Sequence, residues 1–254
     1  MRLLLVALAM LVAAAGASAS ALFNQLAKEY QDHGGVALVA GDAAFPVKLE
    51  AGVIAAKNVL PGDIDLYLYL FRKEFGKYPA TLFPLVGLKR VVFCRDLTFK
   101  GAARAAVADS EHGALYLDVR SGVYSSAYRH KVVHREFFQL IAAASRDGSG
   151  DAGWVALNPA GTLYGRGKPV APGDNAGAVI THPTAGFINA IAQTSVDEDK
   201  AQIFANLMVN DLKTRLLLRQ DTVLVAKIQL LKEQLRQFCK EADASFWQRV
   251  EQDF

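Results

Sequence analysis

The segment HKVVHREFFQLI, from His130 to Ile141, decides how the rest of the chain is interpreted. Apolar residues recur through it at intervals of four and three positions, which is the spacing of one helical face. This stripe consists of Val133, Phe137, Leu140 and Ala144. A serine pair just upstream can begin the helix, so we expect one long helix over about residues 125–145.

The polar side chains of this helix have the spacing of a zinc site. Residues i and i+4 share a helical face, so two histidines at that spacing converge on one Zn²⁺, as in the motif H-E-x-x-H. The glutamate of that motif reaches the zinc-bound water as a general base. His130 and His134 have the right separation, but Lys131 stands where the glutamate belongs.

A resemblance to a known family places the zinc-site motif at a second position along this helix. Residues 134–141, HREFFQLI, resemble the active-site helix of a secreted family of zinc-binding metallopeptidases, which typically reads H-H-E-F-F-H followed by an apolar pair. The resemblance implies that Glu136 is the remnant of the general base. It also implies that Arg135 and Gln139 stand at the positions of two lost histidine ligands.

Further segments extend the resemblance over most of residues 60–210. KRVVFCRDL at 89–97 and LYLDV at 115–119 are similar to strands of the family, and a W…LN…YG pattern follows at 154–165. EDKAQIFA at 198–205 resembles the family's E-D-x-A-E-x-F-A stretch. The resemblance therefore implies Glu198 as the remnant third zinc ligand. Gln202 and Ile191 replace a glutamate and a carbonyl-polarising tyrosine of the family.

The chemistry of these side chains argues against zinc in this register. Arg135 has no acceptor atom and carries a permanent positive charge, so it cannot ligate a dication. Gln139 offers only a carbonyl oxygen, which is a poor zinc ligand. We therefore expect no cofactor, and we expect the guanidinium of Arg135 to take the metal's place and pair with Glu198 or Glu136. The alternative is that Arg135 points into solvent.

An alternative ligand set is His130, His134 and Glu198, which would make the chain an active zinc metallopeptidase. On a helical wheel the histidine pair points roughly 140° away from the pair formed by Arg135 and Gln139. The helix therefore cannot present both pairs to Glu198. Ordinary hydrogen bonds of two partly buried histidines are the other possibility.

The overall pattern predicts an α+β fold, and the resemblance makes it zincin-like. We expect a small mixed sheet packed on the active-site helix, followed by a mainly helical C-terminal half. Strands are expected at residues 35–41, 88–94 and 114–119, and other helices at 20–31, 66–75, 197–210 and 224–238. A Gly/Pro-rich stretch at 146–177 is expected to be a packed excursion, because it carries Trp154 and Tyr164.

The N-terminus predicts entry into the secretory pathway. Arg2 precedes an unbroken apolar run, and small residues stand at Ala17 and Ala19, which is typical of a cleaved signal peptide over residues 1–19. The apolar run is short for a membrane span, although an uncleaved anchor is the alternative. Residues 20–254 would then form a single domain. With 28 basic and 25 acidic residues, nothing favours nucleic acid as a partner.

Two further questions stay open in the sequence. Cys94 and Cys239 either pair in an oxidising compartment or remain free, buried thiols. The chain is either an inactive pseudopeptidase that retains a peptide-binding cleft, the active enzyme described above, or a purely structural secreted protein. For the binding cleft, residues 114–119 are the expected edge strand to which an extended peptide would add.

Overall fold

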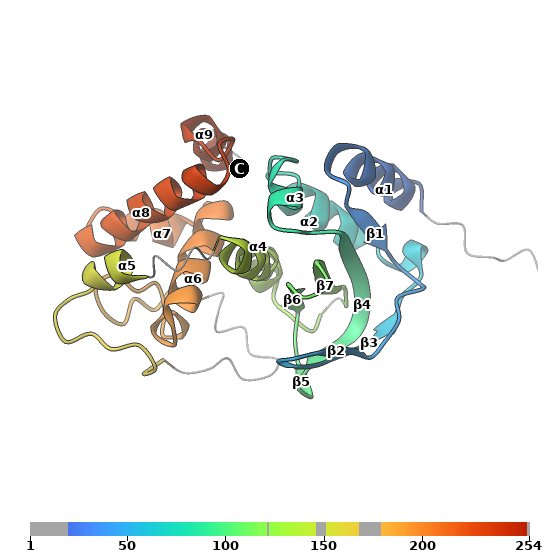
Figure 1. Ribbon diagram of the computed structural model, residues 1–254, viewed down its shortest axis with the longest axis horizontal. Coiled ribbons are helices and arrows are strands. Elements are labelled where there is room, and N and C mark those ends of the chain that lie inside the picture. Colours follow the sequence, from blue (N-terminus) through green and yellow to red (C-terminus); the bar gives the residue numbers. More distant parts are fainter. Residues whose placement is uncertain (1–19, 121, 146–150, 168–178, 253–254) are drawn as a thin grey trace, which may run out of the picture.

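The computed structural model describes residues 20–120, 122–145, 151–167 and 179–252. The predicted signal peptide and parts of the Gly/Pro-rich stretch, including Val170, lie outside these ranges. Within them the chain forms a mixed sheet on one side and a helical half on the other, with one long helix between the two (Figure 1). This arrangement confirms the predicted α+β fold.

The described strands form a seven-stranded mixed sheet. They are β1 Ala37–Val39, β2 Val47–Leu49, β3 Gly52–Asn58, β4 Arg90–Phe99, β5 Ala102–Ala103, β6 Ala106–Asp109 and β7 Ala114–Asp118. The main order is β2-β3-β4-β7-β6, with β1 and β5 also paired to β4. The long strand β4 is parallel to β1 and β7, and the remaining pairs are antiparallel.

The position of β7 corrects one prediction. Residues 114–119 were expected at a sheet edge, but β7 pairs with β4 on one side and with β6 on the other. The edge beside the long helix is β6, a strand of only four residues. Its sequence, AVAD, is too short and too weakly patterned to have been recognised as a strand.

Several of the helices begin at a residue whose side chain caps them. The described helices are α1 Ala21–Gly34, α2 Asp65–Phe75, α3 Leu82–Leu85, α4 Ser126–Ala144, α5 Ala152–Ala156, α6 Val196–Met208, α7 Leu212–Leu217, α8 Thr222–Phe238 and α9 Ala244–Gln252. Short 3-10 helices are η1 Pro61–Asp63 and η3 Ile191–Gln193. Ser20, Ser125 and Ser195 each accept a hydrogen bond from the first turn of α1, α4 and α6, which satisfies backbone donors that the helix leaves free.

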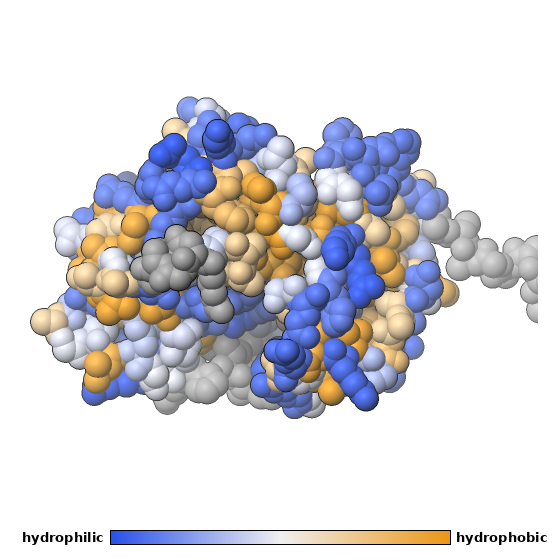
Figure 2. Space-filling view, viewed as in Figure 1, coloured by the Kyte–Doolittle hydropathy of each residue, from blue (hydrophilic) through white to orange (hydrophobic). Residues whose placement is uncertain are grey.

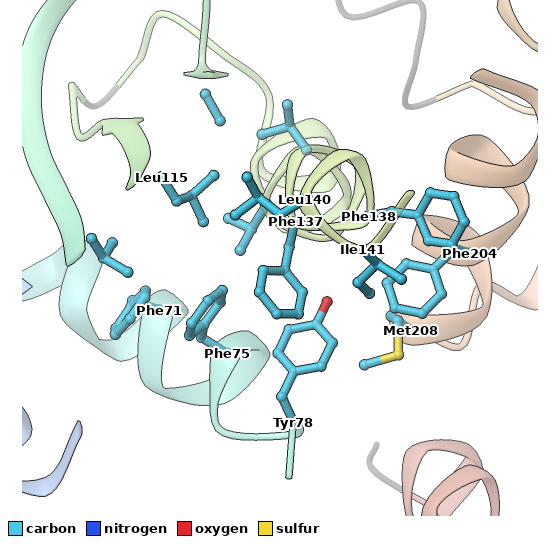
Figure 3. Close-up of a cluster of buried hydrophobic side chains, with 14 of the residues drawn as sticks. Phe71, Phe75, Tyr78, Leu115, Phe137, Phe138, Leu140, Ile141, Phe204 and Met208 are labelled. Atoms are coloured by element: carbon cyan, nitrogen blue, oxygen red, sulfur yellow. The ribbon is translucent and has the colours of Figure 1, made fainter. Parts of the chain in front are cut away.

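The core is organised around α4. Figure 3 shows Phe137 of α4 pointing toward Phe75 of α2 and toward Tyr78, with ring centroids 5.1 and 4.4 Å apart. Phe138, the next residue, faces Phe204 of α6 at 5.1 Å. Consecutive phenylalanines therefore join α4 to the sheet-side helices and to the helical half at once.

The other face of the sheet has its own, smaller cluster. Ile54, Val92, Cys94 and Tyr116 are buried there, and the ring of Phe45 packs on Tyr116. Both Cys94 and Cys239 are free and buried, so the two thiols do not pair. No helix among the described residues is long and apolar enough to cross a membrane.

Two details of the helical stripes differ from expectation. The spacing of Leu66, Leu70, Phe71 and Phe75 predicts one apolar face for α2, but Leu66 is 84% exposed because the buried face runs through Tyr67, Leu68 and Phe71. Ala144, the last residue of the α4 stripe, is also exposed. The predicted excursion is packed where it is described, since Trp154 is fully buried.

Candidate functional site

The candidate site lies where α4 faces the first turn of α6. Arg135 and Glu136 project from the middle of α4, and Glu198 is the third residue of α6. The Glu198 backbone N–H donates to the Ser195 hydroxyl at 3.1 Å, and that cap fixes the first turn of α6. The site therefore depends on an ordinary helix pair and needs no strained backbone.

The Arg135 guanidinium connects the two carboxylates. Its Nε donates to Oε1 of Glu198 and its Nη2 donates to Oε2, both at 2.6 Å. Its Nη1 donates to Oε1 of Glu136. A bidentate fork of this kind is among the strongest charged hydrogen bonds that proteins form. The guanidinium thus lies between the two residues that the family resemblance identifies as the base and the third ligand.

Neutral groups complete the hydrogen bonding of both carboxylates. The backbone N–H of Ala108 in β6 donates to Oε2 of Glu136 at 3.2 Å. The Gln202 amide donates to Oε1 of Glu198 at 2.8 Å, and Asn189 donates to Gln202 at 2.9 Å. The cluster is therefore tied to the sheet on one side and to the segment before α6 on the other.

Burial and charge act in opposite directions on this cluster. The side chain of Arg135 is 23% exposed, and those of Glu136 and Glu198 are 12% and 11% exposed. Burial disfavours the charge on Arg135, but the two carboxylates outweigh it and hold its pKa above the ordinary value. Burial raises the pKa of Glu136, although Arg135 opposes that shift. Arg135 therefore stays charged, and its charge partly offsets the cost of burying the Glu136 carboxylate.

These residues do not fit a zinc ion. A guanidinium occupies the space between the carboxylates, and it has no lone pair to offer a metal. Gln139, one turn further along α4, is partly exposed and makes no hydrogen bond to this cluster in the described part of the chain. Among the described residues no group of three His, Cys, Asp or Glu side chains is placed to hold a metal ion. We therefore derive no reaction step through zinc.

His130 and His134 belong to a different cluster, on the side of α4 that faces α2. His134 is fully buried; its Nδ1 lies 2.6 Å from the Tyr78 hydroxyl and its Nε2 lies 2.9 Å from Oε2 of Glu74. His130 Nδ1 lies 2.5 Å from the other oxygen of Glu74. Lys77 donates to Glu74 as well, at 2.6 Å. The structure thus places both histidines with Glu74, whereas Glu198 is bound to Arg135 and Gln202.

The protonation of this second cluster follows from its burial. Burial lowers the pKa of His134, although Glu74 opposes that shift. Burial disfavours the charged form of Glu74, but hydrogen bonds with His130 and His134 outweigh burial and lower the pKa of this carboxyl group. A neutral His134 donates from Nε2 to Glu74 and accepts from the Tyr78 hydroxyl. These contacts are those of histidines with ordinary hydrogen bonds in a core.

The edge strand β6 lies beside Glu136. Asp118 N–H donates to Ala105 C=O across the β6–β7 pair at 2.8 Å. In an antiparallel pair, every second residue of a strand turns its backbone N–H and C=O toward the partner strand. The backbone groups of Ala106 and Ala108 therefore point away from β7. The outward N–H of Ala108 already donates to Glu136, so Ala106 carries the remaining outward pair of backbone groups in β6.

Sequence reasoning missed part of the site's surroundings. Ile191, predicted to replace a family tyrosine, is buried in η3, where it offers no hydrogen-bonding group. Asn189 and Ala108 were not predicted to contribute, because an amide in a loop and an alanine in a four-residue strand carry no pattern. Lys227 gave no signal either, yet it is fully buried and donates to Asp199 at 2.6 Å.

Comparison with known proteins supports the class of fold and nothing finer. No protein-family model and no curated protein matches the chain. A crystal structure described as a "putative zinc-binding metallo-peptidase" from Bacteroides caccae superposes with a TM-score of 0.56. The two chains share 13% sequence identity, and the match covers 91% of this chain and 90% of the other. The fold is therefore metallopeptidase-like.

Proposed function

We propose that this chain is a secreted pseudopeptidase: a protein with a metallopeptidase-like fold that holds no zinc and cleaves no peptide bond. The observation that carries the proposal is the double pairing of Arg135 with Glu136 and Glu198. The Arg135 guanidinium supplies positive charge to the two carboxylates at the place where a metal ion would otherwise bind them. Secretion rests on the signal-like residues 1–19 alone, and N-terminal sequencing of the exported protein tests it.

The test is to measure zinc and then to restore its ligands. After dialysis against micromolar zinc, we expect the purified wild-type protein to retain far less than a stoichiometric amount. The double substitution Arg135→His with Gln139→His removes the guanidinium and places two imidazoles at i and i+4, opposite Glu198. We expect this variant to bind zinc stoichiometrically, as measured by elemental analysis.

Matched variants separate the ligands from the simple removal of a charge. Arg135→Ala with Gln139→Ala removes the guanidinium without adding a ligand, and it should bind no zinc. Adding Glu198→Gln to the double histidine variant should abolish the restored binding. Stoichiometric zinc in the wild type, lost on substitution of His130 or His134, would instead establish the active-enzyme alternative.

Restored zinc should not restore strong proteolysis. Glu136 would be available as a base, but Ile191 stands where the family has a tyrosine and cannot donate a hydrogen bond to a developing oxyanion. We expect the double histidine variant to cleave unfolded casein no faster than the alanine control. Rapid cleavage that a chelator stops would show that Ile191 is not the missing element.

A second candidate function is zinc-independent peptide binding at β6. The observation that favours it is the outward backbone pair of Ala106 on the edge strand beside Glu136. Only one such pair is free of Glu136, so we expect binding of unfolded casein to be weak. Ala106→Pro removes the outward N–H and should abolish that binding, because proline is tolerated at an edge strand and leaves the β7 pairing intact. Absence of any binding by the wild type would favour the purely structural alternative.

A further inference from the structure

Two polar groups beside Glu136 take no part in the Arg135 cluster. They are the guanidinium of Arg104, in the link between β5 and β6, and the hydroxyl of Tyr128, which lies two helical turns before Arg135 on the same face of α4. Apolar and hydrophilic residues meet on the surface between the sheet side and the helical half of the molecule (Figure 2). The chemistry of a ligand on such a surface depends on which polar groups remain free to bind it.

The Arg104 guanidinium has donors left over. Its Nη1 donates to the neighbouring Ala103 carbonyl at 3.3 Å, and among the described residues it makes no ion pair with a carboxylate. Arg104 is partly buried, but its nitrogens are not enclosed as the Nε atoms of Arg90 and Arg129 are. Because arginine carries a permanent charge and five donors, a guanidinium withdrawn from water normally has an acidic partner. Arg104 can therefore bind an anion from outside the described chain.

The Tyr128 hydroxyl is also unused. It makes no hydrogen bond within the described part of the chain, and it is not enclosed as the hydroxyl of Tyr124 is. The rings of Tyr124 and Tyr128 pack with their centroids 5.6 Å apart, which holds Tyr128 in place. Burial raises the pKa of Tyr128 to about 12, so the hydroxyl keeps its proton at neutral pH and can donate it in a hydrogen bond.

Arg104 and Tyr128 approach Glu136 from the sheet and from the helix. Burial raises the pKa values of Glu136 and Tyr128, and the charge of Arg104 opposes both shifts, so the guanidinium lies near both groups. Glu136 itself is held against β6 by the Ala108 N–H at 3.2 Å. The two free donors therefore lie near the start of β6, where Ala106 carries its outward pair of backbone groups.

We propose that this site binds a carboxylate of an extended peptide, from an acidic side chain or from the C-terminus, with Arg104 and Tyr128 as its hydrogen-bond donors. The inference rests on the peptide binding at β6 proposed above and names the chemistry that it selects. A carboxylate only accepts, and its bonds to a guanidinium are charge-assisted. Arg104 would repel an ammonium group, and an amide lacks the charge. Arg135 already donates to Glu136, which limits the repulsion between Glu136 and a second carboxylate.

Labelled peptides test this selectivity. AVTEVTA and AVTQVTA carry the same neutral dye at the N-terminus and an amidated C-terminus, so only the central residue differs; AVTKVTA is the cationic counterpart. AVTQVTA with a free C-terminus carries its carboxylate at the end instead. We expect fluorescence anisotropy to show that at least one of the two carboxylate peptides binds at least about fivefold more tightly than amidated AVTQVTA, with AVTKVTA the weakest.

Substitutions separate a direct contact from a structural role. Arg104→Gln should lower the affinity for the preferred carboxylate peptide to that for amidated AVTQVTA, whose own affinity should stay unchanged. Tyr128→Phe removes only the hydroxyl and should weaken binding of the carboxylate peptide by about threefold. Arg219→Gln and Tyr69→Phe, the same changes at exposed positions, are the matched controls. Arg104→Glu should reverse the order, so that AVTKVTA binds best.

Three results would overturn the proposal. Amidated AVTQVTA could bind as tightly as both carboxylate peptides, Arg104→Gln could keep the preference for a carboxylate, or no peptide could bind at all. The first two leave peptide binding at β6 in place, and Ala106→Pro would still abolish it. The third removes that binding together with its selectivity. The zinc measurements on Arg135→His with Gln139→His decide the pseudopeptidase proposal in every case.

Discussion

Glu198 and Asp199 are neighbours in the first turn of α6, but each carboxylate meets a different cation in a different setting. Glu198 shares Arg135 with Glu136 in a cluster whose arginine side chain is 23% exposed. Asp199 pairs with Lys227, and both of those side chains are fully buried. The Lys227 ammonium also lies 3.8 Å from the centre of the Phe187 ring and donates to the Gly186 carbonyl at 2.8 Å.

The two cations respond to burial in opposite ways. Burial lowers the pKa of Lys227, and the carboxylates of Asp199 and Asp221 together do not fully offset this. Burial also acts against the charge on Arg135, but two carboxylates outweigh it and its pKa rises. Burial therefore outweighs the nearby carboxylates at Lys227, whereas the carboxylates outweigh burial at Arg135. Under the function proposed above, Arg135 supplies part of the charge that a metal ion would carry, whereas Lys227 makes a structural contact.

The largest expected effect comes from breaking the fully buried pair. Lys227→Met leaves Asp199 buried without its cation, so we expect the free energy of unfolding to fall by about 3–5 kcal/mol. Trp154 and Tyr164 still donate to Asp199, at 2.9 and 2.8 Å, and they cannot neutralise it. Urea denaturation measures the loss, and Lys213→Met, at an exposed position of α7, is the control.

A compensating variant sharpens the same prediction. Adding Asp199→Asn to Lys227→Met removes the uncompensated charge and keeps an acceptor for Trp154 and Tyr164. Because burial penalises the charged forms of both partners, the double variant should be more stable than Lys227→Met alone. If the two variants unfold at the same urea concentration, the loss comes from packing of the lysine stem and not from the orphaned charge.

The effect at Arg135 should be smaller because water reaches the cluster. Arg135→Met leaves Glu136 and Glu198 without their shared cation, but these side chains are partly exposed and can be solvated. We expect the free energy of unfolding to fall by about 1–3 kcal/mol. Arg135→Lys keeps the charge and loses the bidentate fork, so it should lie between the wild type and Arg135→Met. A loss equal to that of Lys227→Met would contradict the contrast between the clusters.

The sequence predicted the Arg135 cluster but not the pair formed by Lys227 and Asp199. The pairing of Arg135 with Glu136 and Glu198 was predicted, because the family resemblance implied that residues 135 and 198 face one site and arginine chemistry leaves this side chain few other roles there. The α4 helix and the inward position of Phe137 were predicted from local signals, namely the apolar period and the serine at the start of the helix.

Long-range placement was not predictable. Lys227 stands in a helical stripe of leucines, where a lysine is ordinarily solvated, and only the fold brings Asp199 to it. The edge strand was misassigned for the same reason: β7 has the stronger strand pattern, but a four-residue neighbour covers its outer edge. The contacts of His130 and His134 with Glu74 could not be predicted from the sequence either, because Glu74 is more than fifty residues away in the chain.

The smallest expected effect concerns pH and Glu136. Burial raises the pKa of Glu136 above its ordinary value of 4.5, so the folded protein keeps this proton to a higher pH than the unfolded chain does. Between 4.5 and the folded pKa, the native state therefore binds more protons, and the contribution of this group to stability falls as the pH rises. Glu136→Gln has no such proton. The stability of the wild type relative to this variant should therefore decline by a fraction of a kcal/mol as the pH rises above 4.5.

A glutamate with the opposite shift gives the control for that measurement. Hydrogen bonds from Arg236 and Gln237 lower the pKa of the exposed Glu233, so its contribution is present above 4.5 and is lost as the pH falls. The stability of the wild type relative to Glu233→Gln should therefore rise with pH, opposite in sign to the result for Glu136→Gln. Urea denaturation of the three proteins from about pH 4 to about pH 7 gives both slopes. If both stability differences rise with pH, Arg135 outweighs burial at Glu136. The pKa of Glu136 would then lie below its ordinary value, as that of Glu233 does.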